Sequence, residues 1–455
     1  MSKELTMFSK KDLKNLIWPL IAEQILITAI GACDTFMVSS TGEAGISGVS
    51  LVDNLSHFVI ALFSAFATGG AVVVSQYIGH KDSQKAESTA HQLIKVSFLA
   101  GLFFVALCLP FKELILRLVY SKIDADVMMN SVTYFIWIVL SLPFLAAYLG
   151  CTALCRSIGN SKVTLKVSFI GNLVNTAGNA ILIYGAGLGV MGAGIATFLS
   201  RIVTLVVIMG FLSRRENSLT IQFRKIISWQ FNQVGKILKI AVPSGVENSF
   251  FQVGRIFVTS LISSFGVIAT SAHAICCTFE VISNIPGVAI GLACLTVIGQ
   301  CIGADEKEQA KAYGRKLMKM TFMGMGMMSV LIFFTIQFLI LPFNLSDEAR
   351  NLAVGVIRTI MVANVVLWPM SFTMPNILRG AGDAKYTMFV SNISMWACRV
   401  LPCILISNWI LAHYPENPAV ALYGIRVGMY IDWAFRTVMF GLRFHGKKWL
   451  EKKVI

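Results

Sequence analysis

Apolar stretches of about 20 residues recur along the whole chain, and each is long enough to cross the ~30 Å hydrocarbon core of a membrane as a helix. We place twelve of them, centred roughly at residues 26, 63, 103, 140, 172, 202, 252, 285, 330, 362, 398 and 430. Inside a bilayer every backbone polar group must be satisfied within the protein, so a spanning segment is a helix or a strand of a closed barrel. The alternating pattern of barrel strands does not occur. The sequence therefore predicts an all-α membrane protein with twelve transmembrane helices.

The composition agrees with this prediction, because 56% of the residues are hydrophobic and only 13% are charged, about half the ~25% charge content of soluble domains. The net charge of +15 fits a cytoplasmic N-terminus, since nearly all Lys and Arg then fall on the cytoplasmic side. There they meet anionic lipid headgroups, and we expect no nucleic-acid partner. We expect a multi-pass protein of the cell membrane with both termini cytoplasmic and its first apolar stretch retained as a helix.

Motifs of the first half return in the second half at a nearly constant distance. PLIAEQ at 19–24 matches PSGVEN at 243–248, and SQYIGHKDSQKA at 75–86 matches GQCIGADEKEQA at 299–310, both with an offset of 224 residues. This indicates a duplication, and because six helices return the chain to the same side, the two pseudo-symmetric repeats are parallel. The predicted parts are an N-lobe at 1–212, a cytoplasmic linker at 213–235 and a C-lobe at 236–455.

One carboxylate, Asp34, interrupts the first apolar stretch within the sequence GACDTFMVSS. Acids inside a membrane are costly and are mostly functional. Asp34 could exchange a proton or coordinate Na⁺, a hard cation that suits oxygen ligands. Because neutralisation changes the cost of enclosing the carboxylate, ion binding could shift an equilibrium between two conformations. Alternatively, Asp34 is satisfied by neighbouring donors or lies at the headgroups, since a polar turn follows closely.

Polar side chains in the fifth and sixth apolar stretches are candidate partners of Asp34. Asn172, Asn175 and Asn179 lie in the fifth stretch, and Asn175 and Asn179 share one helix face because they are four residues apart. Thr197 offers a hydroxyl in the sixth. Amide oxygens can hold a cation, and amide N–H groups can bond Asp34. Ordinary interhelical hydrogen bonding, worth about 0.6–2 kcal/mol, is the alternative.

Further charges lie deep in apolar stretches, at Glu23, Glu247, Arg255, Glu280 and Arg399. Glu23 and Glu247 are equivalent in the two repeats, and they are either architectural or line a cavity that attracts a cationic substrate. Internal Arg–Glu pairs would satisfy these charges, with Arg255 about two turns after Glu247. If the two arginines instead faced a cavity unpaired, an anionic substrate would fit. Asp53 and Asp432 fit either helix ends or cavity edges.

The sequence lacks the motifs of several other function classes. H-E-x-x-H, G-x-S-x-G, a P-loop and the carboxylate runs of a diphosphate-using transferase do not occur. The ten Cys are scattered without nearby His and read as packing residues. We therefore expect no enzyme, no cofactor and no metal site beyond a Na⁺ position at Asp34. No filter-like repeat suggests a channel.

Several motifs together resemble the multidrug and toxic compound extrusion (MATE) family. They are the P-x-x-x-E of Pro19 and Glu23, the Asp-Thr at 34–35, SQYIG at 75–79, GLGVMGAGIATFLSR at 187–201 and LRGAGD at 378–383. The resemblance covers nearly the whole chain. It implies two six-helix lobes that form a V-shaped cleft, and export of organic molecules in exchange for inward H⁺ or Na⁺.

The resemblance also implies a coupling site in the N-lobe. Some members hold a cation with a helix 1 Asp, a helix 5 Asn, an Asp one turn later and a helix 6 Thr, and these match Asp34, Asn175, position 179 and Thr197. Position 179 is Asn here, so this site has one carboxylate where those relatives have two. Pro19 matches the proline at which their helix 1 bends.

A second branch of the family instead uses acids in the C-lobe, where this chain has Phe251 and Trp368. We therefore expect N-lobe coupling. The predicted function is a secondary active exporter of amphiphilic, cationic organic molecules, driven by H⁺ or Na⁺ through Asp34 and acting as a monomer among membrane lipids. The alternative is a lipid-precursor flippase, or an exporter of a specific metabolite, of the same superfamily; a large basic central cavity would favour the flippase.

Overall fold

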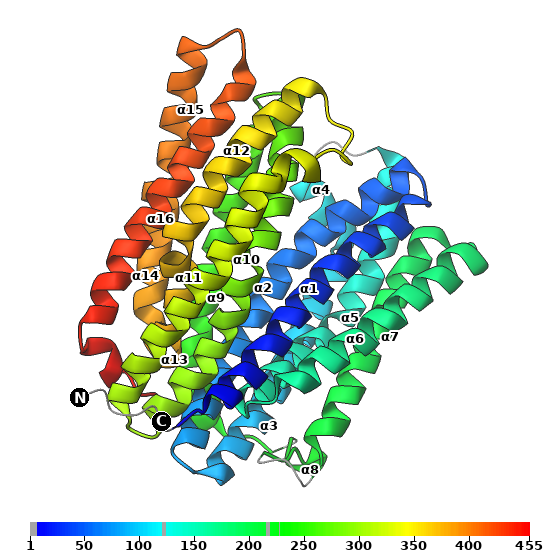
Figure 1. The fold of residues 1–455 in the computed structure, drawn as a ribbon. Coiled ribbons are helices and arrows are strands. Elements are labelled where there is room, and N and C mark those ends of the chain that lie inside the picture. The colour runs from blue at the N-terminus through cyan, green and yellow to red at the C-terminus, as the bar shows by residue number, and fades with distance from the viewer. Residues whose placement is uncertain (1–6, 121–123, 215–218, 227) are drawn as a thin grey trace. The chain divides into compact units, whose positions relative to one another are not determined.

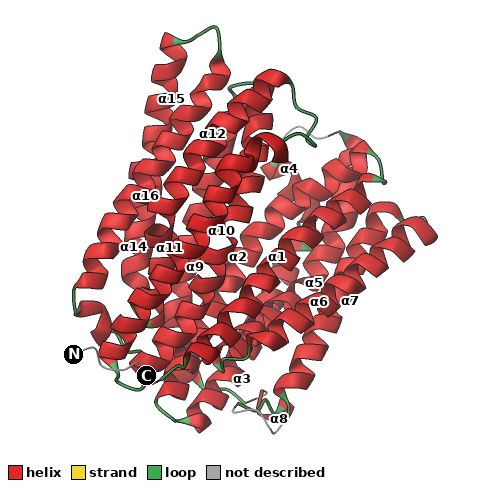
Figure 2. Ribbon diagram, in the orientation of Figure 1, coloured by secondary structure: helices red, strands yellow, loops and turns green. Residues whose placement is uncertain are grey.

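The computed structural model describes residues 7–120, 124–214, 219–226 and 228–455. Every regular element in these ranges is a helix (Figure 2), which confirms the predicted fold class. Residues 215–218 and 227 of the predicted linker lie outside the described part.

The helices pack into two compact units, which we call the N-terminal unit (residues 8–245) and the C-terminal unit (residues 246–454). Helix α9, Phe231–Ser263, begins in the first and ends in the second. The predicted limits of the two lobes and of the linker stay a prediction.

The N-terminal unit holds the helices preceding α9 (Figure 1). They are α1 Lys10–Ser39, α2 Glu43–Gly79, α3 Ser83–Cys108, α4 Lys112–Val119, α5 Ala125–Ser157, α6 Ser161–Asn179 with the π-helical turn η1 Ala180–Gly185, α7 Gly189–Leu212 and α8 Phe223–Ile226. The C-terminal unit holds the helices after α9. They are α10 Val267–Gly303, α11 Lys307–Leu339, α12 Asp347–Val366, η2 Pro369–Thr373, α13 Met374–Gly380, α14 Ala384–Ile393, η3 Ser394–Val400, α15 Leu401–His413, η4 Pro418–Val420, α16 Ala421–His445 and η5 Lys448–Glu451.

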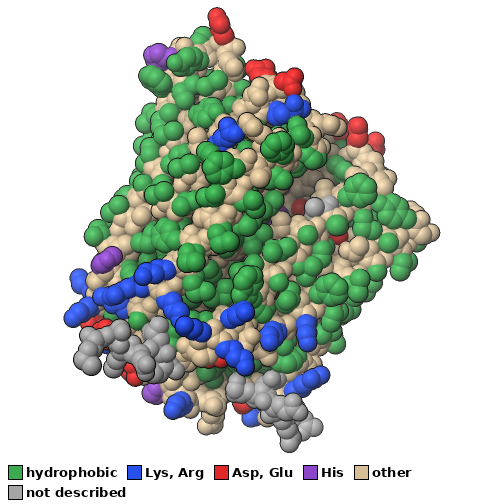
Figure 3. All heavy atoms as spheres, viewed as in Figure 1, with side chains coloured by type: hydrophobic (Ala, Val, Ile, Leu, Met, Phe, Trp, Pro, Cys, Tyr) green, Lys and Arg blue, Asp and Glu red, His purple; other side chains and the backbone are tan. Residues whose placement is uncertain are grey.

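Each of the twelve predicted apolar stretches coincides with a long helix or a stack of consecutive helices. Among the described residues, ten helices are long and apolar enough to cross a membrane. The other two long helices, α9 and α16, fall short because charged side chains interrupt them, such as Glu247 and Arg255 in α9 and Asp432 and Arg436 in α16. In the view of Figure 3, hydrophobic side chains cover the length of the helices and Lys and Arg gather toward one end in each unit.

The duplication is visible in the backbone of the turns. Gly42 precedes α2 with φ of +88° and Gly266 precedes α10 with φ of +95°, an offset of 224 residues. Lys81 and Asp305, again 224 apart, are the non-glycine residues with positive φ in the described chain, at +60° and +59°. The same turn geometry recurs because the same sequence positions must reverse the chain between equivalent helices.

Helix α5 lies at the centre of the N-terminal unit, where it packs against α2, α3, α4, α6 and α7. Its inward side chains, including Tyr134, Phe135, Ile138 and Leu142, join α2 residues such as Phe63 in a buried core. Helix α1 packs along α6 and α2 (Figure 1). This arrangement brings the polar residues of α1, α2, α6 and α7 to one place beside α5.

Candidate functional site

A cavity of about 460 Å³ lies inside the N-terminal unit, lined by α1, α2, α5, α6 and α7. Its ionisable lining consists of Asp34, Asp53, His57, Tyr134, Tyr148 and Arg201, and amides and hydroxyls make up much of the remainder. A cavity with this lining inside a mostly apolar bundle is unusual, because polar groups in a membrane protein are expensive unless they have partners or face water. We refer to it as the N-unit cavity.

Asp34 reaches this cavity from α1, five residues before the helix ends at Ser39. Its Oδ1 accepts a hydrogen bond of 3.0 Å from Nδ2 of Asn179. The contact forms because α1 packs along α6. Asn179 is the last residue of α6 before the π-helical turn η1, and such turns are often found at functional sites because they re-aim side chains.

The amide of Asn175 fits the site in two orientations. With its nitrogen toward Asp34 it donates to Oδ1 at 2.8 Å and Oδ2 at 2.9 Å, and its oxygen accepts from Thr197 Oγ1 at 3.2 Å. In the opposite orientation its nitrogen donates to Thr197 Oγ1 at 3.2 Å, and its oxygen faces the carboxylate. Two facing oxygen acceptors need a proton or a cation between them. The structure thus brings together all four residues predicted for cation coupling.

Two buried amide atoms at this cavity have no hydrogen-bond partner, Oδ1 of Asn179 and Nδ2 of Asn172. Asn179 is only 2% exposed, and an unsatisfied buried polar atom is costly. The free oxygen of Asn179 is an acceptor beside Asp34, and it is suited to a cation or to a donor from a ligand. Of the described His, Cys, Asp and Glu residues, no three come together as a metal-binding group.

A second carboxylate, Asp53 of α2, lines the same cavity. Tyr134 of α5 donates its hydroxyl to Asp53 Oδ1 at 3.3 Å, and Arg201 of α7 interacts electrostatically with both. Arg201 donates from Nη1 to Ser141 Oγ at 2.5 Å. Sequence reasoning left Asp53 undecided and did not consider Arg201. The signal was that Arg201 follows Thr197 by four residues, and so shares its helix face.

Glu23 and Glu247 are buried in equivalent places of the two units, with exposures of 4% and 6%. Thr164 donates to Glu23 Oε2 at 2.7 Å, and its repeat equivalent Thr387 donates to Glu247 Oε2 at 3.2 Å. Arg379 pairs with Glu247 at 2.7 Å. These contacts favour the architectural interpretation of both glutamates, and neither lines the N-unit cavity.

The predicted partners of the other deep charges were wrong. Arg255 is exposed, and the partner of Glu247 is Arg379 because α13 lies closer to Glu247 than the next two turns of its own helix do. Glu280 pairs with Arg426 at 3.1 Å. Arg399 does not pair with a glutamate.

Arg399 instead pairs with Asp432, inside the C-terminal unit. Asp432 is 0% exposed and lies in the middle of α16, so it is not at a helix end. The position of the expected C-lobe acids is filled by aromatic rings, with Phe251 and Phe372 in edge contact at 6.2 Å and Trp368 stacked on Phe372 at 5.1 Å.

Pro19 lies within α1, which continues unbroken from Lys10 to Ser39. Proline removes one backbone hydrogen bond and tends to kink a helix. A hinge role for Pro19 stays a prediction.

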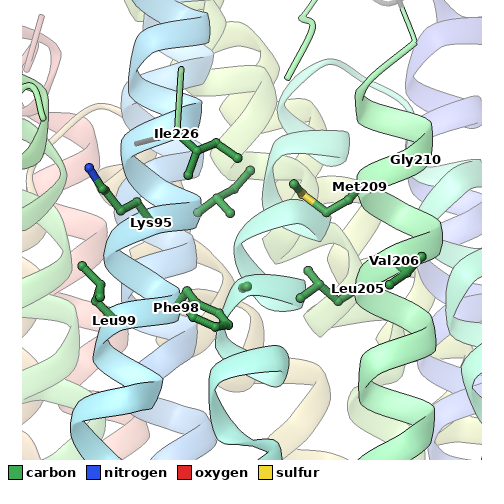
Figure 4. Close-up of a pocket in the computed structure, with 10 residues that line it drawn as sticks. Lys95, Phe98, Leu99, Leu205, Val206, Met209, Gly210 and Ile226 are labelled. Carbon is green, nitrogen blue, oxygen red and sulfur yellow. The ribbon is translucent and has the colours of Figure 1, made fainter. Parts of the chain in front are cut away.

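A second cavity of about 510 Å³ opens between α3, α5 and α7 and lacks acidic residues (Figure 4). Its lining is apolar apart from Lys95, and it includes Phe98, Leu205 and Met209. Among these two cavities, only the N-unit cavity has side chains that can hold an ion.

Comparison with known proteins agrees with this picture. The family model described as MatE matches residues 19–181 and 243–405, which are offset by the same 224 residues as the sequence motifs and together make up most of the chain. The Bacillus subtilis protein described as uncharacterized transporter YisQ is 26% identical over 97% of this chain and 95% of its own. A probable multidrug resistance protein NorM from Thermotoga maritima is 23% identical, with 98% and 94% covered.

A solved structure shares the fold. It is described as the outward-facing conformation of a multidrug resistance MATE family transporter of the MOP superfamily, and it has a TM-score of 0.86 at 20% identity, with 96% of each chain covered. The chain therefore belongs to the MatE family, and it is a multi-pass membrane transport protein rather than an enzyme.

Proposed function

We propose that this transporter is a secondary active multidrug exporter, which moves amphiphilic, cationic organic molecules out of the cell in exchange for H⁺ or Na⁺. The observation that carries the proposal is the carboxylate of Asp34, which lines a polar cavity and receives hydrogen bonds from neutral amides, Asn179 and Asn175. A carboxylate without a bound positive partner in such a place gains most from taking up a proton or a cation.

Asn175 can report whether that cation is present. When Asp34 is ionised and empty, the amide nitrogen of Asn175 faces the carboxylate. When a proton or Na⁺ sits between Asp34 and Asn175, the amide oxygen faces it and the nitrogen turns to Thr197. The two arrangements differ in the contacts between α1, α6 and α7, so ion binding can favour one conformation of the unit over another. A bend of α1 at Pro19 would be one outlet for this difference.

Relatives support the exporter assignment. The Thermotoga maritima protein and others like it are named as multidrug resistance proteins. We propose further that the protein works without a cofactor, as a monomer, in the cell membrane with both termini in the cytoplasm. The lysines at the start of α1 and in the turn between α2 and α3 support this orientation.

The test is efflux of ethidium from cells, with Asp34→Asn compared at equal expression. We expect coupled efflux to fall to background, because the amide cannot exchange a proton and binds Na⁺ weakly. Asp126→Asn is the control, since that acid is exposed at the start of α5 and should leave efflux unchanged. Proteoliposomes with separately imposed pH and Na⁺ gradients identify the ion. Undiminished efflux by Asp34→Asn would contradict the proposal.

A further inference from the structure

The N-unit cavity holds two carboxylates but also one guanidinium. Asp34 lies on α1, Asp53 on α2 and Arg201 on α7. The other ionisable groups that line it are His57 of α2 and Tyr134 and Tyr148 of α5, which are neutral in their usual forms at neutral pH. Since arginine stays protonated in proteins, the empty cavity carries a net charge of one negative unit when both acids are ionised.

The two carboxylates have different surroundings. The described hydrogen-bond donors to Asp34 are the amides of Asn175 and Asn179. Asp53 receives a phenol hydroxyl from Tyr134 and lies in the field of Arg201. Charges interact strongly at a distance where water is scarce, so Arg201 compensates Asp53 without a direct salt bridge.

Arg201 is held in place by its own contact. Its Nη1 donates to Ser141 Oγ on α5, and α5 packs along α7. The guanidinium therefore cannot leave with a transported ion, whereas a proton or Na⁺ at Asp34 can.

We propose that Arg201 is a tethered counter-ion for Asp53, so that Asp34 alone remains for the coupling ion and one ion is exchanged in each transport cycle. This inference rests on the proposed function and adds the number of ions to it. Asp53 and Arg201 are positioning residues in this scheme, because they set the charge of the cavity without holding the exchanged ion.

The experiment measures the ion-to-substrate ratio in proteoliposomes, from the ion gradient at which net ethidium flux is zero. We expect one ion per ethidium for the natural chain and two for Arg201→Met, because Asp53 then needs a mobile cation. Arg201→Met with Asp53→Asn should return the ratio to one. A matched control removes the buried pair of the other unit, Arg426→Met with Glu280→Gln, and should keep the ratio at one.

Asp53→Asn alone provides a second measurement if Arg201→Met does not fold. Arg201 then has no carboxylate except Asp34, so the ion concentration for half-maximal transport should rise at least ~10-fold, and adding Arg201→Met should restore it. An unchanged ratio in Arg201→Met, or an unchanged half-maximal concentration in Asp53→Asn, overturns the counter-ion. A natural ratio of two that Asp53→Asn reduces to one also overturns it. If Asp34→Asn keeps the natural ratio, the proposed function fails instead.

Discussion

Nε of Arg399 lies 2.8 Å from Oδ2 of Asp432, in the interior of the C-terminal unit. Arg436 donates to the other oxygen, Oδ1, also at 2.8 Å, and none of the three is more than 3% exposed. One carboxylate thus compensates two guanidiniums, and both lie against the ring of Phe251 at 5.2 and 5.7 Å. Three helical segments, η3, α16 and α9, are joined at this point.

Asp432→Asn should destabilise the protein more than Arg436→Met does. The first change leaves two buried guanidiniums without a carboxylate, and breaking a buried pair costs about 3–5 kcal/mol. The second leaves Arg399 and Asp432 as a neutral pair. The midpoint of thermal unfolding of the purified protein measures the order, which is wrong if Arg436→Met lowers the midpoint as much as Asp432→Asn.

Gly382→Ala should cost more stability than Gly159→Ala, although the two glycines occupy equivalent turns. Both have positive φ, +80° at Gly159 and +104° at Gly382, so an alanine is strained at either position, by about 1–2 kcal/mol. A Cβ at Gly382 would also lie 2.1 Å from the carbonyl oxygen of Lys452, whereas nothing lies within 4 Å of one at Gly159. Equal unfolding midpoints for the two variants would show that the C-terminal segment yields freely.

Asn179→Asp should strengthen binding of the coupling cation. The change puts a second carboxylate 3.0 Å from Asp34, and two like charges this close favour a shared proton or Na⁺. We expect the ion concentration for half-maximal ethidium transport to fall on the order of 10-fold. Asn172→Asp, which adds the same charge about two turns earlier on α6, is the control and should have a smaller effect. Equal effects from both variants would mean that general cavity charge, rather than the Asp34 site, sets the affinity.

His91→Ala should loosen the segment that follows α7. Nε2 of His91 accepts the backbone N–H of Gln222 at 2.9 Å, and Ser228 O accepts from Gln92 at 2.9 Å and from Lys95 at 3.1 Å. Losing one such bond costs about 1 kcal/mol, so trypsin cleavage after the exposed Lys225 should accelerate roughly fivefold. Acidification should act in the same direction, because a protonated imidazole cannot accept the Gln222 N–H.

Much of the fold was predictable because it depends on local patterns. Apolar stretches located all twelve long helices, and the constant offset located the turns at Gly42 and Gly266 before any coordinates. The i, i+4 spacing of Asn175 and Asn179 was enough to place both on the face that meets Asp34. In the same way, the equivalence of Glu23 and Glu247 was visible in the motifs, and each has an equivalent threonine donor.

The identity of each charge's partner was not predictable. Glu247 pairs with Arg379 of α13, which is distant in sequence, rather than with Arg255 of its own helix. Asp53 could have been at a helix end, but the packing of α2 against α5 turns it into the cavity of Asp34.

The sequence by itself determined that this chain is a duplicated helical membrane protein with an acid in its first span, since burial period, span length and repeat offset are properties of neighbouring residues. Only the tertiary structure decided which acids share a cavity and which charges are compensated. The rotation of each helix about its axis, and the choice of its neighbours, come from side-chain packing between distant segments, and a change of one helical position moves a charged group by about 100° around the helix.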